Sequence, residues 1–195
     1  YFIFSAEILG EVNNYYGSIP GWDTILHTIN GFLCAAVGFA LVDMLNRSQR
    51  TKLHLSPVYL SLMAFCFSMT IGVLWEFFEF AGDRLMGLDM QKDFIVSAFS
   101  SVTLDPTGGG SVIAVESITR TTIETANGEI FSINGYLDIG IIDTMKDLMV
   151  NFIGAVVFSV IGYFYTKNNR KGAIAKQFIP VVLDCGKEDT GDNNL

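Results

Sequence analysis

Carboxylates recur at helical spacing at the end of a long apolar run. Glu76, Glu79 and Asp83 follow the apolar segment 57–74, and their spacings of three and four residues place them on one helix face. Acids beside a run of membrane length are costly unless they face a protein interior, a partner or water. A buried face of this kind can bind a cation or take up protons, and both require neighbours that keep it away from lipid.

Two further apolar segments carry polar residues in their first turns. Asp23, His27 and Asn30 share a face near the start of segment 25–45, and segment 140–166 begins with a similar set. Carboxylates with one imidazole suit Mg²⁺, Mn²⁺, Ca²⁺ or Zn²⁺, and unpaired buried carboxylates take up protons. We therefore predict a site with Glu76, Glu79, Asp83, Asp143, Asp147, His27 and Asp23 as candidate cation ligands, and Asn151, Lys146 and Asn30 as further polar lining.

A purely structural network is the alternative for the same residues. Asp23 can act only as a helix cap, Lys146 can pair with Glu79, and Asn151 can join helices by hydrogen bonds. The spacing of Glu76 and Glu79 is Glu-x-x-Glu, so the Glu-x-x-His signature of di-iron bundles is missing. No catalytic residue and no cofactor other than a divalent cation is predicted.

Composition indicates the elements that must position these groups. Half of the residues are apolar, only 16% are charged, and the mean hydropathy is +0.41. Because the apolar residues come in runs of about 20, the length that a bilayer requires, we expect an all-α membrane protein. We expect this protein to be a multi-pass helical bundle with a small β-containing extracytoplasmic insert. We expect the end of one helix and two full spans in 1–86, the insert in 87–139, a further span in 140–166 and a basic, then acidic, tail in 167–195.

The insert differs in kind from the apolar segments. Its β-branched residues alternate, and the Asn127–Gly128 pair predicts a hairpin turn. The glycines at 108–110 are expected to form a turn, because no Lys-Ser/Thr pair follows them as in a phosphate-binding loop.

Basic residues predict the orientation of the spans. They gather in segment 46–55 and after residue 166, so both regions are expected on the cytoplasmic side and 87–139 outside. The predicted site then lies at the outer end of the bundle. A transport path would require polar residues through the cytoplasmic half of the spans. The sequence offers little there beyond Asp43, which counts against transport. The basic residues are Arg47, Arg50, Lys52, Lys167, Arg170, Lys171 and Lys176.

Several motifs resemble known families. WDTILHTINGF (22–32), WEFFEFAGD (75–83), DMQKD (89–93) and GYLDIGIIDTMKDLMVNFIGA (135–155) resemble the YjdF-like family of uncharacterised bacterial integral membrane proteins. That resemblance implies a multi-pass protein of the bacterial inner membrane, with further helices before Tyr1, and it brings no activity.

A fainter similarity is to VanZ-like proteins, which are linked to glycopeptide antibiotic resistance. Their Asp-x-x-x-His corresponds to Asp23 and His27, and their Asp-x-x-x-Asn-x-x-Gly to Asp147, Asn151 and Gly154. Their Glu-x-x-Gln is Glu-x-x-Glu here, and their arginine has no counterpart.

We expect a carboxylate-rich pocket that binds or moves a cation, a proton or a small solute. The alternatives are an envelope enzyme acting on a lipid-linked or cell-wall substrate, with a carboxylate as general base, or an accessory subunit without activity. Expected partners are membrane lipid, the cation or solute, and a second copy or a partner subunit. Nucleic acid is excluded, because no basic stripe with interleaved aromatic residues occurs.

Overall fold

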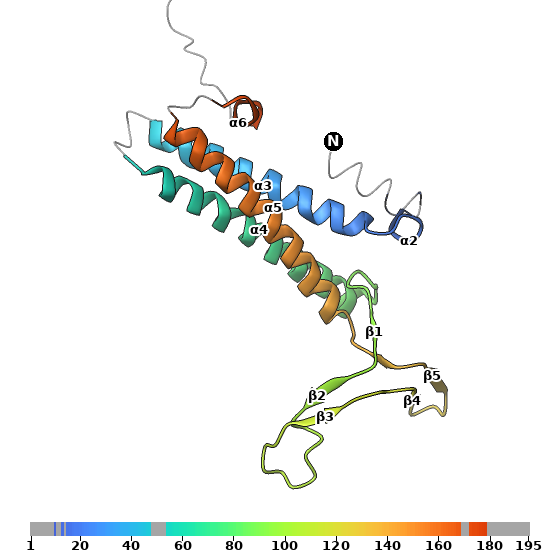
Figure 1. Ribbon diagram of the computed structural model, residues 1–195. Helices are drawn as coiled ribbons and strands as arrows, with labels where there is room; N and C mark the ends of the chain where they lie inside the picture. The colour runs from blue at the N-terminus through green and yellow to red at the C-terminus, as the bar shows by residue number, and fades with distance from the viewer. Residues whose placement is uncertain (1–9, 11–12, 14, 48–53, 169–171, 179–195) are drawn as a thin grey trace, which may run out of the picture.

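Three long helices form the body of the protein. The computed structural model describes residues 10, 13, 15–47, 54–168 and 172–178, so the expectations for 1–9, 48–53 and 179–195 lie outside it. The long helices pack side by side, and each is long and apolar enough to cross a membrane (Figure 1). This confirms the predicted helical membrane fold. The helices are α2 (Tyr15–Ser18), α3 (Trp22–Arg47), α4 (Pro57–Met86), α5 (Ile141–Lys167) and α6 (Ala173–Phe178).

Local signals fix where α4 begins and ends. The Ser56 hydroxyl accepts a hydrogen bond from the Tyr59 N–H, and Pro57 occupies the first turn, where its missing N–H costs nothing. Gly87 ends the helix in the left-handed region at φ 66°, a conformation that glycine adopts without a steric penalty. The bounds of this span therefore follow from residues visible in the sequence.

Small residues let the helices approach closely. A Cβ at Gly154 of α5 would meet the backbone of Thr28 and Phe32 on α3, and one at Gly31 would meet the Asn151 backbone. From this contact toward Arg47 and Lys167, the core is aromatic and aliphatic, and Phe39 and Phe158 are completely buried. Large apolar side chains such as Phe77, which is 64% exposed, cover the outside of the bundle. Lipid and core are equally apolar, so close packing must hold the three spans together.

The segment between α4 and α5 is a β-rich arm that projects from one end of the bundle (Figure 1). The β4–β5 hairpin turns at Asn127–Gly128, and Gly128 has φ 85°, which confirms the predicted hairpin. The antiparallel pairs are β1 (Ile95–Val96) with β6 (Tyr136–Leu137), β2 (Phe99–Ser101) with β3 (Ile113–Val115), and β4 (Thr121–Glu124) with β5 (Ile130–Ile133).

The glycine run at 108–110 lies in the β2–β3 loop. Asp105 accepts hydrogen bonds there from the Thr107 hydroxyl and N–H and from the Ser111 N–H. These donors lower the pKa of Asp105 to about 2. The glycines thus serve a turn organised by one carboxylate.

A candidate cation site at the carboxylate end of the bundle

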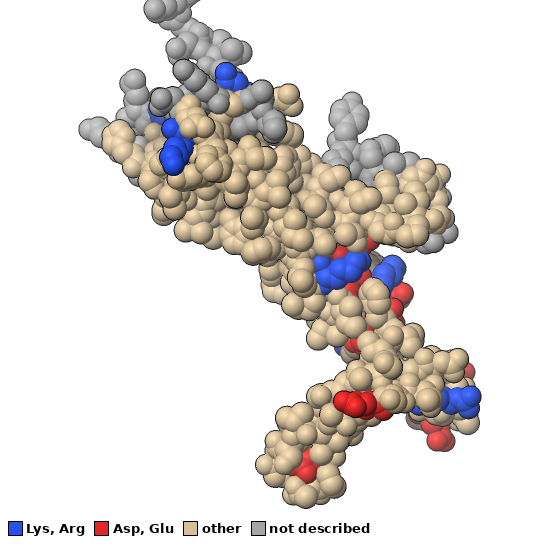
Figure 2. Space-filling model, viewed as in Figure 1, with Lys and Arg blue, Asp and Glu red and all other residues tan. Residues whose placement is uncertain are grey.

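The polar residues of all three spans meet at one end of the bundle. We call this the carboxylate end, where α3 and α5 begin and α4 ends, and we call the opposite end, with Arg47 and Lys167, the basic end. Figure 2 shows charged residues near both ends and an uncharged surface between them on the face in view. The buried acids Glu76 of α4 and Asp147 of α5 lie at the carboxylate end, where both face His27 of α3.

His27 lies at the centre of the carboxylates. Its Nε2 is 3.5 Å from Asp23 Oδ1 and 3.8 Å from Asp147 Oδ2, and its Nδ1 is 4.0 Å from Glu76 Oε1. The side chains of Asp147, Glu76 and His27 are 2%, 5% and 12% exposed. One imidazole from α3 therefore faces acids from α3, α4 and α5.

Lys146 lies on the other side of the same acids. Its Nζ is 3.4 Å from Asp23 Oδ2, 3.6 Å from Asp143 Oδ1 and 3.9 Å from Asp147 Oδ1. The expected alternative, a pair with Glu79, is not what the structure shows. The single ammonium leaves the ionised site with excess negative charge, which a bound cation or protons would offset.

Two buried oxygens in this cluster have no hydrogen-bond partner among the described residues. They are Glu76 Oε2 and Asp147 Oδ1. A buried carboxylate oxygen without a partner costs free energy, so an arrangement of this kind favours a further cation or bound protons.

Asp23, His27 and Asp147 lie close enough together to hold a metal ion. Their candidate ligand atoms all lie within 4.8 Å of one another. Ligands about 2.0–2.2 Å from a Zn²⁺ ion are roughly 3.3–3.6 Å apart in a tetrahedron, so small side-chain rotations would complete the site. Both aspartates and the histidine were predicted from the sequence; their role as ligands stays a prediction.

Three of the other predicted residues lie close to this cluster. Asp143 is buried, faces Lys146 and accepts a hydrogen bond from the Lys92 N–H at 3.0 Å. Glu79 is 9% exposed and accepts a hydrogen bond from Trp75 Nε1 at 2.7 Å. Asn151 is 1% exposed and lies deeper along the same stripe as Asp147, with its amide 3.6 Å from Met69 Sδ.

Asp83 and Asn30 have other partners. Asp83 accepts hydrogen bonds from the Met90 and Gln91 N–H groups at 2.6 and 2.9 Å, so it holds the chain that follows α4. Asn30 accepts a contact of 3.5 Å from Cys34 Sγ, one turn along its own helix. In the part of the chain that the structure describes, Asp83 forms no ion pair with His27 or Lys146, although Glu76 on the same helix approaches His27.

The sequence did not single out Gln91 and Thr144. Gln91 Nε2 donates to Thr144 Oγ1 at 2.5 Å, which ties the chain after α4 to the first turn of α5. Gln91 lies outside any helix, so no periodic pattern marks it. The motif DMQKD was the one signal that could have drawn attention to it.

An apolar layer separates this site from the basic end. Phe39 and Phe158 fill the middle of the bundle, and Asp43 lies beyond them, buried and 2.5 Å from the Arg47 guanidinium. Among the described residues, the buried polar side chains between the carboxylate end and Asp43 are the uncharged Ser61, Ser68 and Ser159.

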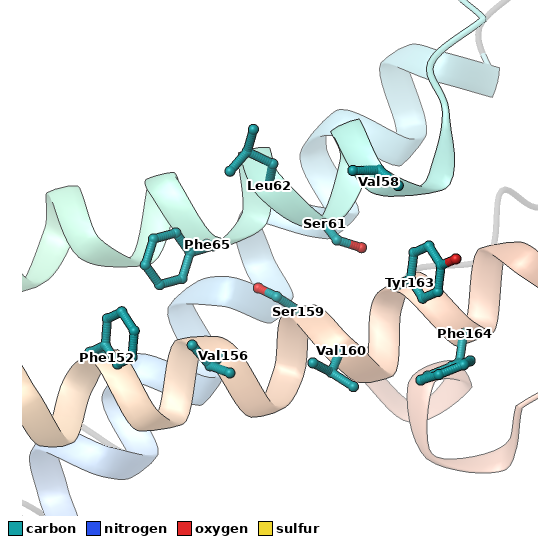
Figure 3. Close-up of a pocket in the computed structure, with 10 residues that line it drawn as sticks. All are labelled: Val58, Ser61, Leu62, Phe65, Phe152, Val156, Ser159, Val160, Tyr163 and Phe164. Atoms are coloured by element: carbon teal, nitrogen blue, oxygen red, sulfur yellow. The ribbon is translucent and has the colours of Figure 1, made fainter.

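A groove of 480 Å³ lies between α4 and α5, nearer the basic end (Figure 3). Its walls are apolar, with residues such as Phe65 and Phe152, and the hydroxyls of Ser61 and Ser159 lie along it. No acid or histidine lines it. Its lining therefore lacks the carboxylates and the imidazole that make the carboxylate end a candidate cation site.

The sequence matches, over residues 1–168, a family described as a predicted membrane protein family (DUF2238). The chain belongs to that family. An uncharacterized protein of Thermotoga maritima is 30% identical over 84 residues, which cover 43% of this chain and 41% of that protein. No solved structure matches this chain. The family match includes every predicted site residue, so the cluster belongs to the part of this DUF2238 protein that its family shares.

Proposed function

We propose that this DUF2238 protein binds one divalent cation at the carboxylate end of its helical bundle. The observation that carries the proposal is the convergence of Asp23, His27 and Asp147, whose ligand atoms lie within 4.8 Å of one another. They come from two helices, and Glu76 approaches the imidazole from the third. Intramembrane acids that meet in this way are expensive to bury and usually functional.

The ligand set favours Zn²⁺ or Mn²⁺. Imidazole nitrogen with two carboxylates suits these ions better than it suits Ca²⁺, which takes six to eight oxygens. His27 would bind through Nε2, because Nδ1 faces Glu76. A carboxylate behind the second imidazole nitrogen is the usual way in which a protein orients a metal-binding histidine.

The same proposal includes an orientation. Arg47 and Lys167 mark the basic end, which we assign to the cytoplasmic side of a bacterial inner membrane. The cation site then opens toward the exterior, beside the β-rich arm. The apolar layer around Phe39 and Phe158 supports binding rather than movement of a cation across the membrane.

The motif resemblances noted in the sequence involve the same residues. The residues that match VanZ-like proteins are Asp23, His27, Asp147, Asn151 and Gly154, and they lie along the inner faces of α3 and α5. The YjdF-like resemblance likewise includes the segments that carry His27, Glu76 and Asp147.

Metal binding to the purified full chain tests the proposal. We expect one equivalent of Zn²⁺ or Mn²⁺ by titration calorimetry and elemental analysis, and a loss of at least about tenfold in affinity for Asp147→Asn and His27→Ala. Glu116→Gln removes an equal charge from the exposed arm and is the control. If wild-type protein binds no more metal than Asp147→Asn, the proposal is wrong.

A metal-dependent envelope enzyme is a second candidate. Three protein ligands leave a coordination position open for water or substrate, as catalytic zinc sites do. Lys146, whose side chain is 38% exposed, lies next to that position and would face an incoming anionic group. Turnover of a lipid-linked phosphate substrate that is lost in Asp147→Asn would favour this candidate over binding alone.

A further inference from the structure

We infer that Lys146 occupies a second cation position in the same cluster and so limits the site to one metal ion. The inference rests on the proposed cation site at Asp23, His27 and Asp147. It concerns Asp23 Oδ2 and Asp147 Oδ1, the carboxylate oxygens that face Lys146 rather than His27.

Each of these aspartates faces two different groups. Asp23 directs Oδ1 to His27 and Oδ2 to Lys146, and Asp147 directs Oδ2 to His27 and Oδ1 to Lys146. Both carboxylates therefore bridge a position beside the imidazole and a position at the lysine ammonium. Carboxylates that bridge in this way are typical of sites that hold two ions about 3.5–4 Å apart.

Asp143 belongs to the lysine side alone. Its Oδ1 is 3.6 Å from Lys146 Nζ, and its Oδ2 accepts the Lys92 N–H. With Asp23 Oδ2 and Asp147 Oδ1 it surrounds the ammonium with three carboxylate oxygens from two helices. Three such oxygens are also a reasonable ligand set for a divalent ion.

The ammonium does not satisfy this position fully. Its distances of 3.4–3.9 Å exceed those of a charge-assisted hydrogen bond, about 2.7–2.9 Å. Asp147 Oδ1 accordingly has no hydrogen-bond partner among the described residues, although the Asp147 side chain is only 2% exposed. An unpartnered buried oxygen directed at this position indicates that a cation closer to the carboxylates would fit there.

Lysine suits the role of a permanent second cation. Its ammonium is a compact point charge on a flexible stem, so it neutralises the bridging oxygens without fixing them rigidly. A neutral side chain of similar length would leave the position empty and its three oxygens unpaired. A second divalent ion would then bind beside the first and share Asp23 and Asp147.

The test is the stoichiometry of Mn²⁺ binding to the full chain. We expect one ion in wild type and two in Lys146→Met, with the spin-coupled electron paramagnetic resonance signal of an ion pair in the variant. Lys146→Arg keeps the positive charge and should bind one ion. The double variant Lys146→Met with Asp143→Asn should also return to one, because it lacks a ligand that only the lysine position uses.

The results separate this inference from the proposed function. One ion in both wild type and Lys146→Met would overturn the inference and leave the cation site intact, whereas no binding in either would overturn both. If Lys146→Met does not fold, Asp143→Asn in the wild-type background decides. It should change the affinity for the single ion by less than about tenfold, and abolition of binding would place Asp143 at the first position and reject the inference.

Discussion

The carboxylate end and the apolar layer around Phe39 and Phe158 are built by the same helices with opposite chemistry. On α5, one buried stripe begins with Asp143, Asp147 and Asn151 and continues beyond Gly154 with Phe158. On α3, the stripe likewise passes from His27 to Phe39. Along each stripe the polar residues of the carboxylate end give way to an aromatic residue, and buried polar residues return beyond it at Ser159 and Asp43.

The two regions meet where the helix backbones are closest. Gly154 contacts the Thr28 backbone, and Gly31 contacts the backbone of Asn151, so α3 and α5 touch without intervening side chains. Such contacts replace the hydrophobic effect that is absent between helices in lipid. If this junction separates the two regions, changes on each side of it should have separable effects.

The largest effect is expected at the junction itself. Gly154→Val would force its side chain against backbone atoms of Thr28 and Phe32, which cannot move without separating α3 from α5. We expect a loss of about 3 kcal/mol or more in the free energy of unfolding, together with loss of metal binding. Thermal unfolding in detergent, monitored by size-exclusion chromatography, measures the change.

Gly162→Ala is the control for that substitution. Gly162 also lies on the inner face of α5, but the atoms nearest to a Cβ there belong to the Phe39 side chain rather than to backbone. Alanine at each position gives a matched pair, and Gly162→Ala should destabilise the protein clearly less than Gly154→Ala. Equal effects would show that the backbone contact at Gly154 does not define the junction.

A smaller effect is expected in the apolar layer. Phe158 is completely buried, and Phe158→Ala would leave a cavity that lowers the free energy of unfolding by about 2 kcal/mol. This cost is smaller than in a soluble protein, because a phenylalanine ring is almost as favourable in lipid as between helices. The affinity for Mn²⁺ at the carboxylate end should stay within about twofold of wild type. Phe164→Ala, at a residue that is 51% exposed on the same helix, should cost much less. Weaker metal binding in Phe158→Ala at unchanged stability would mean that the two regions are coupled.

Helical spacing predicted most of the fold and part of the site. It brought Asp23, His27 and Asp147 to one level, because residues four apart share a face and α3 and α5 both begin at this end. It could not separate Glu76 from Asp83. Asp83 is seven residues further along α4, and its partners are N–H groups made available by the chain reversal after Gly87.

The partners of Lys146 were also beyond the sequence. Lys146 is three positions from Asp143 and next to Asp147 in the sequence, and Glu79 on another span was a reasonable partner. The pairing with Asp23 of α3 depends on how α3 and α5 are rotated against each other at the glycine contacts, whereas Asp143 and Asp147 lie on the same helix as Lys146. Rotation of this kind is set by packing between helices rather than by the pattern along one of them.

The smallest effect is expected where the β-rich arm joins α5. Asp138 accepts hydrogen bonds from the N–H groups of Phe94, Ile142 and Gly140, at 2.6, 2.8 and 3.3 Å. Partial burial alone would raise the pKa of Asp138, but these donors outweigh it and lower the pKa below its ordinary value. The carboxylate thus favours the folded arm when it is ionised, and Asp138→Ala should cost about 1 kcal/mol locally at pH 7.

The pH dependence of that contribution follows from the sign of the shift. Because the folded-state pKa is lower than the unfolded one, the contribution is complete above about pH 4 and disappears as the pH falls through the folded pKa. Hydrogen exchange at the Phe94 and Ile142 amides, corrected for intrinsic rates, should be faster in Asp138→Ala at pH 7, and the difference from wild type should shrink below pH 4. Glu124→Ala, in the exposed β4 strand, should leave both amides unchanged. A difference that persists undiminished at low pH would show that the Asp138 charge does not hold the arm to α5.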